Sequence, residues 1–111
     1  QAYRMQYPSA EDKIILAENS PVGRLMIARL EGAMVIVDIA VAPEHRRRGI
    51  ASRIIKSLQS ESSVTTGRII LRVDKYNRSA YELYRKLGFV VENENQILYS
   101  MVWDPDGKEK T

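Results

Sequence analysis

Short apolar runs separated by turn residues fill the first part of the chain. Residues 12–17, 24–30 and 33–41 each hold closely spaced aliphatic side chains and predict β-strands. The segment 19–23, with its Pro and Gly, is expected to form the first turn, and residues 31–32 a tight hairpin turn before the third strand. Because the third run is apolar at nearly every position, it is typical of a central strand buried on both faces.

Apolar positions with helical spacing follow in two places. From Ile50 to Leu58 they recur on one helical face, and the polar stretch 60–67 is expected to end this helix. A second amphipathic helix is expected over 77–87, with Gly88 as its C-terminal stop. Further strands are predicted at 68–73, 89–91 and 96–103. This order predicts an α/β (α+β) fold, in which a mixed central sheet carries helices packed on its faces.

The composition excludes several classes of site. The 111 residues fit a single domain, expected over residues 1–103, with a polar tail at 104–111. The absence of cysteine excludes disulfides, thiolate metal sites and an acyl-cysteine intermediate, and the single histidine excludes a multi-histidine metal site. We therefore expect no metal. The net charge of +3 allows an anionic partner, and the longest apolar run, 33–41, is too short to span a membrane.

The segment 41–52 combines the end of a strand, a loop with three arginines and the start of a helix. The first amides of a helix lack intrahelical acceptors and carry the positive end of the helix dipole. Gly49 lets a ligand approach the backbone, and Arg46, Arg47 and Arg48 add positive charge. Together these features suit a pyrophosphate group. The alternative is that the arginines form an ordinary solvated surface.

Asn77 and Tyr84 are the candidate functional side chains of the second helix. Asn77 stands at the expected start of the helix, where asparagine is a common N-cap. Tyr84 lies on the apolar face, where it is either a core aromatic residue or a hydroxyl that gives up a proton at the edge of the sheet. The residues alone leave these roles open.

The two segments match two sequence motifs in order. Arg46-Arg47-Arg48-Gly49-Ile50-Ala51 fits Gln/Arg-x-x-Gly-x-Gly/Ala and follows a strand that ends in Ile39-Ala40-Val41-Ala42-Pro43. The pattern N-x-x-A-x-x-L-Y-x-K-x-G-F is met by Asn77, Ala80, Leu83, Tyr84, Lys86, Gly88 and Phe89. On these motifs the chain resembles the GNAT N-acetyltransferase superfamily, with its strands and helices in the order of that family. The resemblance covers about residues 13–103.

The resemblance implies acetyl-CoA as the donor substrate. It places the pantetheine arm along the exposed backbone of residues 39–41, and the pyrophosphate on the amides of residues 47–52 with the arginine side chains near its phosphates. It makes Tyr84 the general acid that protonates the departing CoA thiolate, while a backbone amide near Ala40 or Val41 holds the thioester oxygen. The implied donor-binding residues are Ile39, Ala40, Val41, Arg46, Arg47, Arg48, Gly49, Ile50, Ala51, Ser52 and Asn77.

The reaction implied is direct attack of an amine on the thioester within a ternary complex. The general base of the family does not carry over. The glutamate that some members have five residues before the Asn is Arg72 here, and a second family position falls at about Val35. A water chain to solvent, or an amine that loses its proton before binding, could replace the base. The remaining side-chain candidates are Asp38, Glu31, Glu92 and Glu94.

The start of the chain departs from the family as well. The family usually opens with a strand and one or two helices, for which only residues 1–7 stand in here, as the expected end of the second helix. Since the first residue is Gln rather than Met, we expect a trimmed, truncated or partly disordered start, with a compact variant of the fold as the alternative. The loss of those elements exposes a sheet edge, which could pair with a second copy to form a homodimer.

Three function classes remain open on the sequence. The leading one is a cytoplasmic N-acetyltransferase that acts on a primary amine, with a small molecule favoured over a protein as acceptor. The second is an acyl-CoA-binding sensor on the same fold, without turnover. The third is a small basic nucleic-acid-binding module that uses the arginines at 46–48. Because these form a short cluster without interleaved aromatic residues, we expect no nucleic-acid partner.

Overall fold

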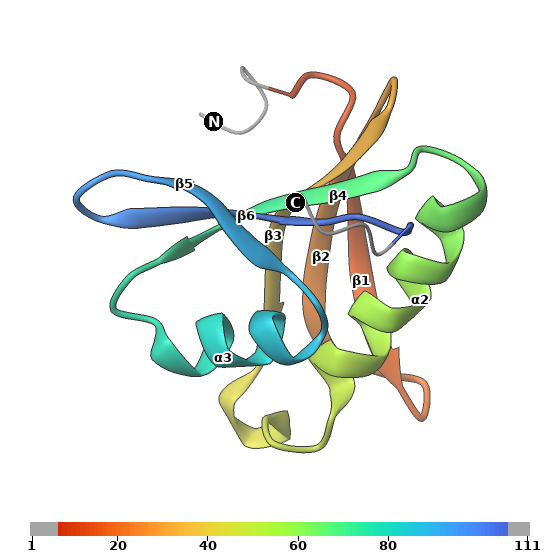
Figure 1. The fold of residues 1–111 in the computed structure, drawn as a ribbon. Coiled ribbons are helices and arrows are strands. Elements are labelled where there is room, and N and C mark those ends of the chain that lie inside the picture. Colours follow the sequence, from red (N-terminus) through yellow and green to blue (C-terminus); the bar gives the residue numbers. More distant parts are fainter. Residues whose placement is uncertain (1–6, 107–111) are drawn as a thin grey trace.

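The computed structural model describes residues 7–106, which form a six-stranded mixed sheet (Figure 1). The strands are β1 (Glu11–Ala17), β2 (Ser20–Leu30), β3 (Ala33–Val41), β4 (Arg68–Asp74), β5 (Val90–Glu94) and β6 (Leu98–Trp103), and they lie in the order β1-β2-β3-β4-β6-β5. The helices are η1 (Pro43–His45), α2 (Ile50–Val64) and α3 (Arg78–Lys86). The predicted fold class is confirmed, and Ala33–Val41 is the predicted central strand.

The parallel strands β3 and β4 pair only at their beginnings. Their register runs from Ala33 opposite Arg68 to Ile36 opposite Leu71. Residues 37–41 of β3 and 72–74 of β4 continue without pairing with each other. The sheet therefore opens between its two central strands at their carboxyl ends.

A β-bulge at Val37 coincides with the point where this pairing stops. In the ladder between β2 and β3, the register slips by one residue between Ile36 and Asp38. Before the bulge, Met34 and Ile36 pack into the main core cluster, and after it Ile39 packs against the same cluster. The extra residue thus exchanges the two faces of β3, which is what a bulge does to a strand with an alternating pattern.

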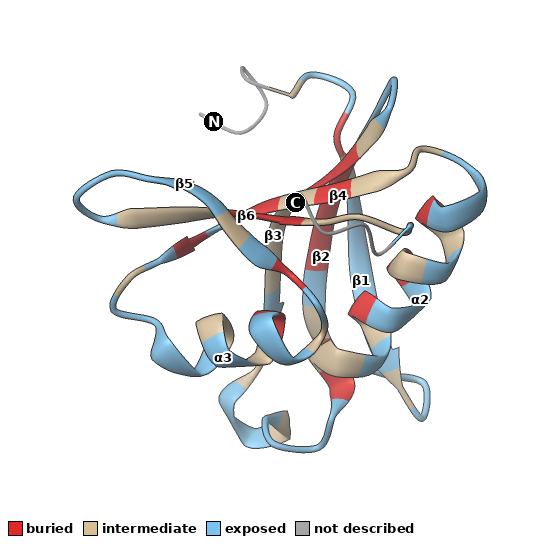
Figure 2. Ribbon diagram, in the orientation of Figure 1, coloured by how far each residue is buried: buried red, intermediate tan, exposed pale blue. Residues whose placement is uncertain are grey.

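Helices α2 and α3 lie on the same side of the sheet (Figure 1) and fill the main core with it. Ile55 of α2, Phe89 after α3, and Ile27 and Met101 of the sheet have no exposed surface, and the buried positions follow the strands under the helices (Figure 2). A smaller cluster consists of Met26 and Ala28 of β2, Val35 of β3 and Ala10 just before β1. The first half of β3 is therefore buried on both faces, as predicted, whereas residues 37–41 are intermediate or exposed.

The first turn differs from the prediction, because residues 20–23 belong to β2. The chain reverses at Glu18 and Asn19 instead, whose φ angles of 53° and 68° suit the tight turns that match the twist of paired strands. Pro21 is tolerated within β2 because the pairing of β2 with β3 begins only at Gly23.

The other boundaries shift for local reasons. Helix α2 continues through the polar stretch expected to end it, since the hydroxyls of Ser63 and Thr65 donate to carbonyls one turn earlier and Ser62 is fully buried. The amide groups of Ile97 and Leu98 donate to the Asn95 side chain, so the turn occupies 95–97 and β5 extends to Glu94. The expectations for residues 1–6 and 107–111 lie outside the described residues.

Strand β1 forms one edge of the sheet, next to β2. Its side chains Ile14 and Leu16 are 65% and 59% exposed. An apolar edge strand of this kind can pair with another chain, so the homodimer stays a prediction.

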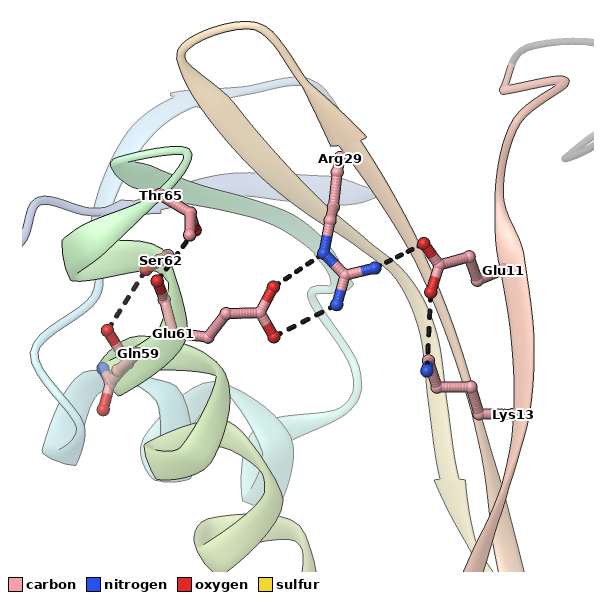
Figure 3. Close-up of polar contacts among 7 residues, drawn as sticks. All are labelled: Glu11, Lys13, Arg29, Gln59, Glu61, Ser62 and Thr65. Atoms are coloured by element: carbon pink, nitrogen blue, oxygen red, sulfur yellow. Dashed lines mark hydrogen bonds and ion pairs between the residues drawn. The ribbon is translucent and has the colours of Figure 1, made fainter.

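A network centred on Arg29 fastens α2 to the first two strands (Figure 3). The Arg29 guanidinium donates to both carboxylate oxygens of Glu61 on α2, with N···O distances of 2.6 and 3.1 Å, and to the carboxylate of Glu11 on β1. The Lys13 ammonium lies 3.4 Å from the other oxygen of Glu11. Hydrogen bonds from Arg29 lower the pKa of both carboxyl groups, and the carboxylates in turn raise the pKa of Arg29.

These shifts make the stability of the network depend on pH. Because the folded pKa values of Glu11 and Glu61 are lowered, their contribution is complete above the ordinary value of 4.5 and is lost as the pH falls through the folded values. We expect Arg29→Met to lower the free energy of unfolding by about 1 kcal/mol at pH 7, the scale of partly exposed ion pairs, and by clearly less at pH 3. Urea denaturation at both pH values measures this.

Arg24→Met is the matched control. Arg24 forms one exposed pair with Asp12 at 3.1 Å and does not reach a helix. We expect a smaller loss from this change at pH 7. An Arg29→Met loss that is as large at pH 3 as at pH 7 would show that the side chain acts by packing alone.

Candidate active site

A cavity of about 430 Å³ lies where β3 and β4 separate. Its walls are the facing parts of the two strands, together with residues from α3 and from the segment before β1. The lining residues are Tyr7, Val35, Ile36, Val37, Asp38, Ile39, Ile70, Leu71, Arg72, Val73, Asp74, Asn77, Tyr84 and Leu98. The opening is a consequence of the four-residue register between the strands, beyond which no neighbouring strand fills the space.

The backbone at the end of β3 faces this opening. The Ala42 amide donates to the Val22 carbonyl at 2.8 Å, and the alternation of an antiparallel ladder then directs the polar groups of Ile39 and Val41 away from β2. The Val41 carbonyl already accepts from Nε of Arg46 at 2.9 Å. Of the three residues predicted to hold the pantetheine arm, Ile39 and Val41 therefore present backbone groups, whereas the backbone of Ala40 faces β2.

Gly23 is a residue that the sequence interpretation assigned to a turn, although it shapes the site. It pairs with Val41, and a Cβ atom at this position would lie 2.2 Å from the carbonyl oxygen of Ala40. Only glycine allows β2 to approach the end of β3 this closely. The Pro and Gly composition of segment 19–23 hid this role, because it also fits a turn.

The start of α2 forms a second cavity of about 200 Å³. The N-cap residue of α2 is Gly49, with a φ of 76°, and no side chain caps the helix. The amides of residues 50–52 precede the first intrahelical bond, from Arg53 to Gly49, and so lack intrahelical acceptors. The lining residues are Val41, His45, Arg46, Arg47, Gly49, Ile50, Ala51, Ser52 and Leu83.

The polar atoms around this cavity suit an anion. Nδ1 of His45 is buried and has no hydrogen-bond partner among the described residues. Arg46 and Arg47 line the cavity, and neither forms an ion pair with a carboxylate of residues 7–106, so their charge is not neutralised. Arg48 does not line it; its carbonyl accepts from Arg53 at 3.4 Å. The wall of this cavity is almost entirely apolar, but the cavity adjoins the uncapped amides of the helix start and two arginines whose charge no described carboxylate neutralises.

The two cavities follow one another along the same two elements. Ile39 lines the first and Val41 the second, both on β3. Tyr84 lines the first and Leu83 the second, both on α3. A ligand that lies along the end of β3 therefore passes from the opening in the sheet to the start of α2.

Tyr84 is a core aromatic residue, one of the two roles that the sequence left open, and it also lines the cavity between β3 and β4. Its side chain is 8% exposed, belongs to the main core and packs on Phe89, with 5.9 Å between the ring centroids. Its hydroxyl forms no hydrogen bond with another residue in the range 7–106. Burial, and to a smaller extent the negative charge of Asp38, raise the pKa of Tyr84 above its ordinary value of 10. The hydroxyl therefore stays protonated at neutral pH.

Asn77 caps α3, as the sequence predicted. Its side-chain oxygen accepts from the amide of Ala80 at 3.2 Å. The residue also lines the cavity between β3 and β4. Because the cap uses the oxygen, the NH₂ group of the side chain is left as a donor for a ligand.

Of the four acidic residues proposed as bases, Asp38 lines the cavity beside Tyr84. Glu31 lies in the turn between β2 and β3, Glu92 pairs with Arg68 at 2.9 Å, and Glu94 pairs with Lys75 at 2.5 Å. The structure adds Arg72, Asp74 and Tyr7 to the wall of the cavity. The sequence does not mark Asp74 or Tyr7, since neither belongs to a motif.

Two searches of residues 7–106 gave negative results. No helix in this range is long and apolar enough to cross a bilayer. No group of three or more His, Asp and Glu side chains in the same range could hold a metal ion.

Comparisons with known proteins identify the family of this chain. The family model of the acetyltransferase (GNAT) domain matches residues 10–91. Spermidine N(1)-acetyltransferase of Escherichia coli (strain K12) is 38% identical over 58 residues, which are 50% of this chain and 31% of that protein. Streptothricin acetyltransferase A of Bacillus subtilis (strain 168) is 29% identical over 85 residues, 75% of this chain and 49% of that protein. The chain thus matches less than half of the length of either relative.

A solved structure shows the same fold. A GNAT family acetyltransferase from Elizabethkingia anophelis with acetyl-CoA bound superimposes with a TM-score of 0.79. The superposition covers 94% of this chain and 82% of that chain, at 17% sequence identity.

The coupling between Asp38 and Tyr84 can be tested without any ligand. Because Asp38 disfavours the phenolate, Asp38→Asn should lower the pKa of Tyr84, while burial keeps it above the value of 10 for a free tyrosine. NMR titration of ring-labelled tyrosine, with Tyr84→Phe to assign the signal, measures the pKa in both proteins. An unchanged value in Asp38→Asn would show that the two groups are not neighbours in solution.

Proposed function

Because the chain belongs to the family of GNAT acetyltransferases, we propose that it transfers an acetyl group from acetyl-CoA to a primary amine. The observation that supports this most strongly is the continuity of the two cavities along the end of β3 and along α3. A thioester with a long arm and a pyrophosphate needs extended backbone beside an anion site, and these elements offer both.

In this proposal the first turn of α2 binds the pyrophosphate of the donor. The amides of residues 50–52 supply directed hydrogen bonds, and Arg46 and Arg47 supply charge. The outward-facing backbone groups of Ile39 and Val41 bind the pantetheine arm as a neighbouring strand would. Arg48 is assigned a more distant electrostatic contribution, since it does not line the cavity.

The reaction is direct attack of the amine nitrogen on the thioester carbonyl carbon. The new C–N bond forms as the C–S bond breaks, and the sulfur takes the proton of the Tyr84 hydroxyl. The Tyr84 hydroxyl is protonated at neutral pH, as a general acid must be, and it lines the cavity in which the thioester would lie. Ile39 lines the cavity that contains Tyr84, so its amide, on the open side of β3, is the proposed donor to the carbonyl oxygen as negative charge develops there.

Asp38 is the proposed acceptor of the proton that the amine loses. It lines the same cavity as Tyr84, and its carboxylate forms no ion pair with the described residues. A free carboxylate near the reacting nitrogen both attracts an ammonium group and removes its proton. The names of the two relatives, a spermidine and a streptothricin acetyltransferase, support a small amine as the acceptor.

Gly49 gives a test of donor binding with a matched control. Gly49→Asp places a carboxylate at the start of α2, where the φ of 76° is unfavourable for a side chain but is tolerated better by aspartate than by most residues. We expect at least tenfold weaker binding of coenzyme A by calorimetry, because the carboxylate repels the pyrophosphate. Gly32→Asp introduces the same residue at a similar φ (83° against 76°) in the turn between β2 and β3. We expect it to bind coenzyme A as the parent does, and equal affinity for both variants would refute the assigned site.

Tyr84→Phe tests the chemical step. We expect turnover of acetyl-CoA with an amine to fall about 100-fold with little change in coenzyme A affinity, because the phenyl ring keeps the packing and lacks the proton. Tyr81→Phe is the control, since Tyr81 lies on the same helix but stacks on Tyr99, with 4.9 Å between ring centroids. Thiol release measures turnover. An unchanged rate in Tyr84→Phe would exclude the hydroxyl as the acid, and coenzyme A binding without turnover of any amine by the parent would favour a sensor.

A further inference from the structure

A third hollow, of about 320 Å³, adjoins the opening between β3 and β4. It lies on β4 and the hairpin of β5 and β6, and its lining residues are Arg72, Asn93, Glu94, Asn95, Leu98 and Ser100. Arg72 and Leu98 also line the cavity that contains Tyr84. The two spaces therefore meet at these side chains, and the proposed transfer does not use the outer one.

The neutral side chains of this hollow are arranged as donors. The side-chain oxygen of Asn95 accepts from the amides of Ile97 and Leu98, at 2.9 and 2.8 Å. The side-chain oxygen of Asn93 accepts from the amide of Glu94 at 2.9 Å. With both oxygens engaged by the backbone, the NH₂ groups are the parts left to meet a ligand. Such groups bind an acceptor, as the hydroxyl of Ser100 also can.

The uncompensated charge in the hollow is positive. Glu94 is paired with the ammonium of Lys75 at 2.5 Å, and that ammonium also lies over the Tyr99 ring, 5.1 Å from its centroid. Arg72 forms no ion pair with any carboxylate in the range 7–106. A guanidinium beside two amide donors is a recognition set for a carboxylate.

The inner cavity, which Arg72 also borders, adds two carboxylates. Asp38 and Asp74 both line it, and the Asp74 carboxylate accepts from the amide of Tyr76 at 2.9 Å. When an amine reaches Tyr84, its ammonium end lies near the carboxylates of Asp38 and Asp74. The other end of the molecule lies near Arg72. A polycation would be attracted by the carboxylates of the inner cavity but repelled by Arg72 at the outer hollow.

Resting on the proposed function, we propose that the acceptor is a small amine that also carries a carboxylate. Its ammonium lies beside Asp38, where it loses its proton, and its carboxylate is bound by Arg72, Asn93 and Asn95. Arg72 is then a specificity-determining residue. It stands at the position where some members of the family have a glutamate base. In this chain the residue at that position would bind an anion instead of transferring a proton.

An acceptor series tests this with matched pairs. Glycine, 3-aminopropanoate, 4-aminobutanoate and 5-aminopentanoate are each compared with the alkylamine of the same chain length, with thiol release as the readout. We expect at least a tenfold higher kcat/KM for the amino acid at its best length, the scale of one charge-assisted hydrogen-bond pair. Spermidine should be a poorer acceptor than the best amino acid. If alkylamines or spermidine react as well at every length, the proposed transfer stands and the anion subsite is refuted.

Arg72→Gln and a binding measurement separate the two proposals. In Arg72→Gln, the ratio of kcat/KM for the amino acid to kcat/KM for the matching alkylamine should fall close to one. Arg68→Gln on the same strand should keep the ratio of the parent, because Arg68 pairs with Glu92 outside both cavities. NMR titration with N-acetyl-3-aminopropanoate should shift the side-chain amide signals of Asn93 and Asn95, and N-propylacetamide should not. If no amine is acetylated but these shifts occur and vanish in Arg72→Gln, the transfer proposal fails and the subsite is supported. If the two compounds shift these signals equally, the subsite is refuted.

Discussion

The separation of β3 from β4 after four paired residues is the constraint on which the site depends. Beyond Ile36 and Leu71 the two central strands share no hydrogen bonds, so the facing backbone groups must be satisfied by water or by a ligand. The bulge at Val37 begins at this point, and Gly23 lets β2 stay close to the departing end of β3. The end of β3 therefore stays unpaired in the middle of the sheet. An extended ligand can lie along this part of the strand.

An opening of this kind is stable only if the rest of the sheet is firmly held. The core under α2 and α3 joins β2, β3, β4 and β6 in one cluster, with Phe89, Ile55 and Met101 fully buried. Gln59 of α2 donates to the Leu87 carbonyl at the end of α3 at 2.8 Å, and Arg29 fastens α2 to β1 and β2. The start of α2 and the face of α3 therefore keep their positions relative to the open strands. Preorganised amides and hydroxyls need no rearrangement when charge develops.

The sequence predicted the elements and the two motif segments well, because apolar spacing and helix caps are local signals. Asn77 as a cap and Ile50, Ile55 and Leu58 as a buried face are of this kind. It failed where a residue acts through a distant partner. Gly23 looked like a turn residue because its close contact is with Ala40, and Asp38 could not be separated from three other acids until the bulge placed it near Tyr84. The helix end was misplaced for a local reason: residues 60–64 are mostly polar, yet the Ser63 hydroxyl donates to the Gln59 carbonyl within the helix.

The charges around the opening are ordered along its length, and this order limits what can react there. Free amides and arginines at the start of α2 favour an anion, and Asp38 beside Tyr84 favours an ammonium group near the reacting atoms. On the far side of the opening, the positive charge of Arg72 lies next to the side chains of Asn93 and Asn95. Their oxygens accept hydrogen bonds from backbone amides, so their NH₂ groups are left as donors. A substrate with a single sign of charge cannot match both of the last two positions. The negative charge of Asp38 on β3 and the positive charge of Arg72 on the neighbouring β4 therefore fit a zwitterionic substrate. Each charge of such a substrate lies beside a side chain of opposite charge, so neither Asp38 nor Arg72 is left uncompensated when the cavity is filled.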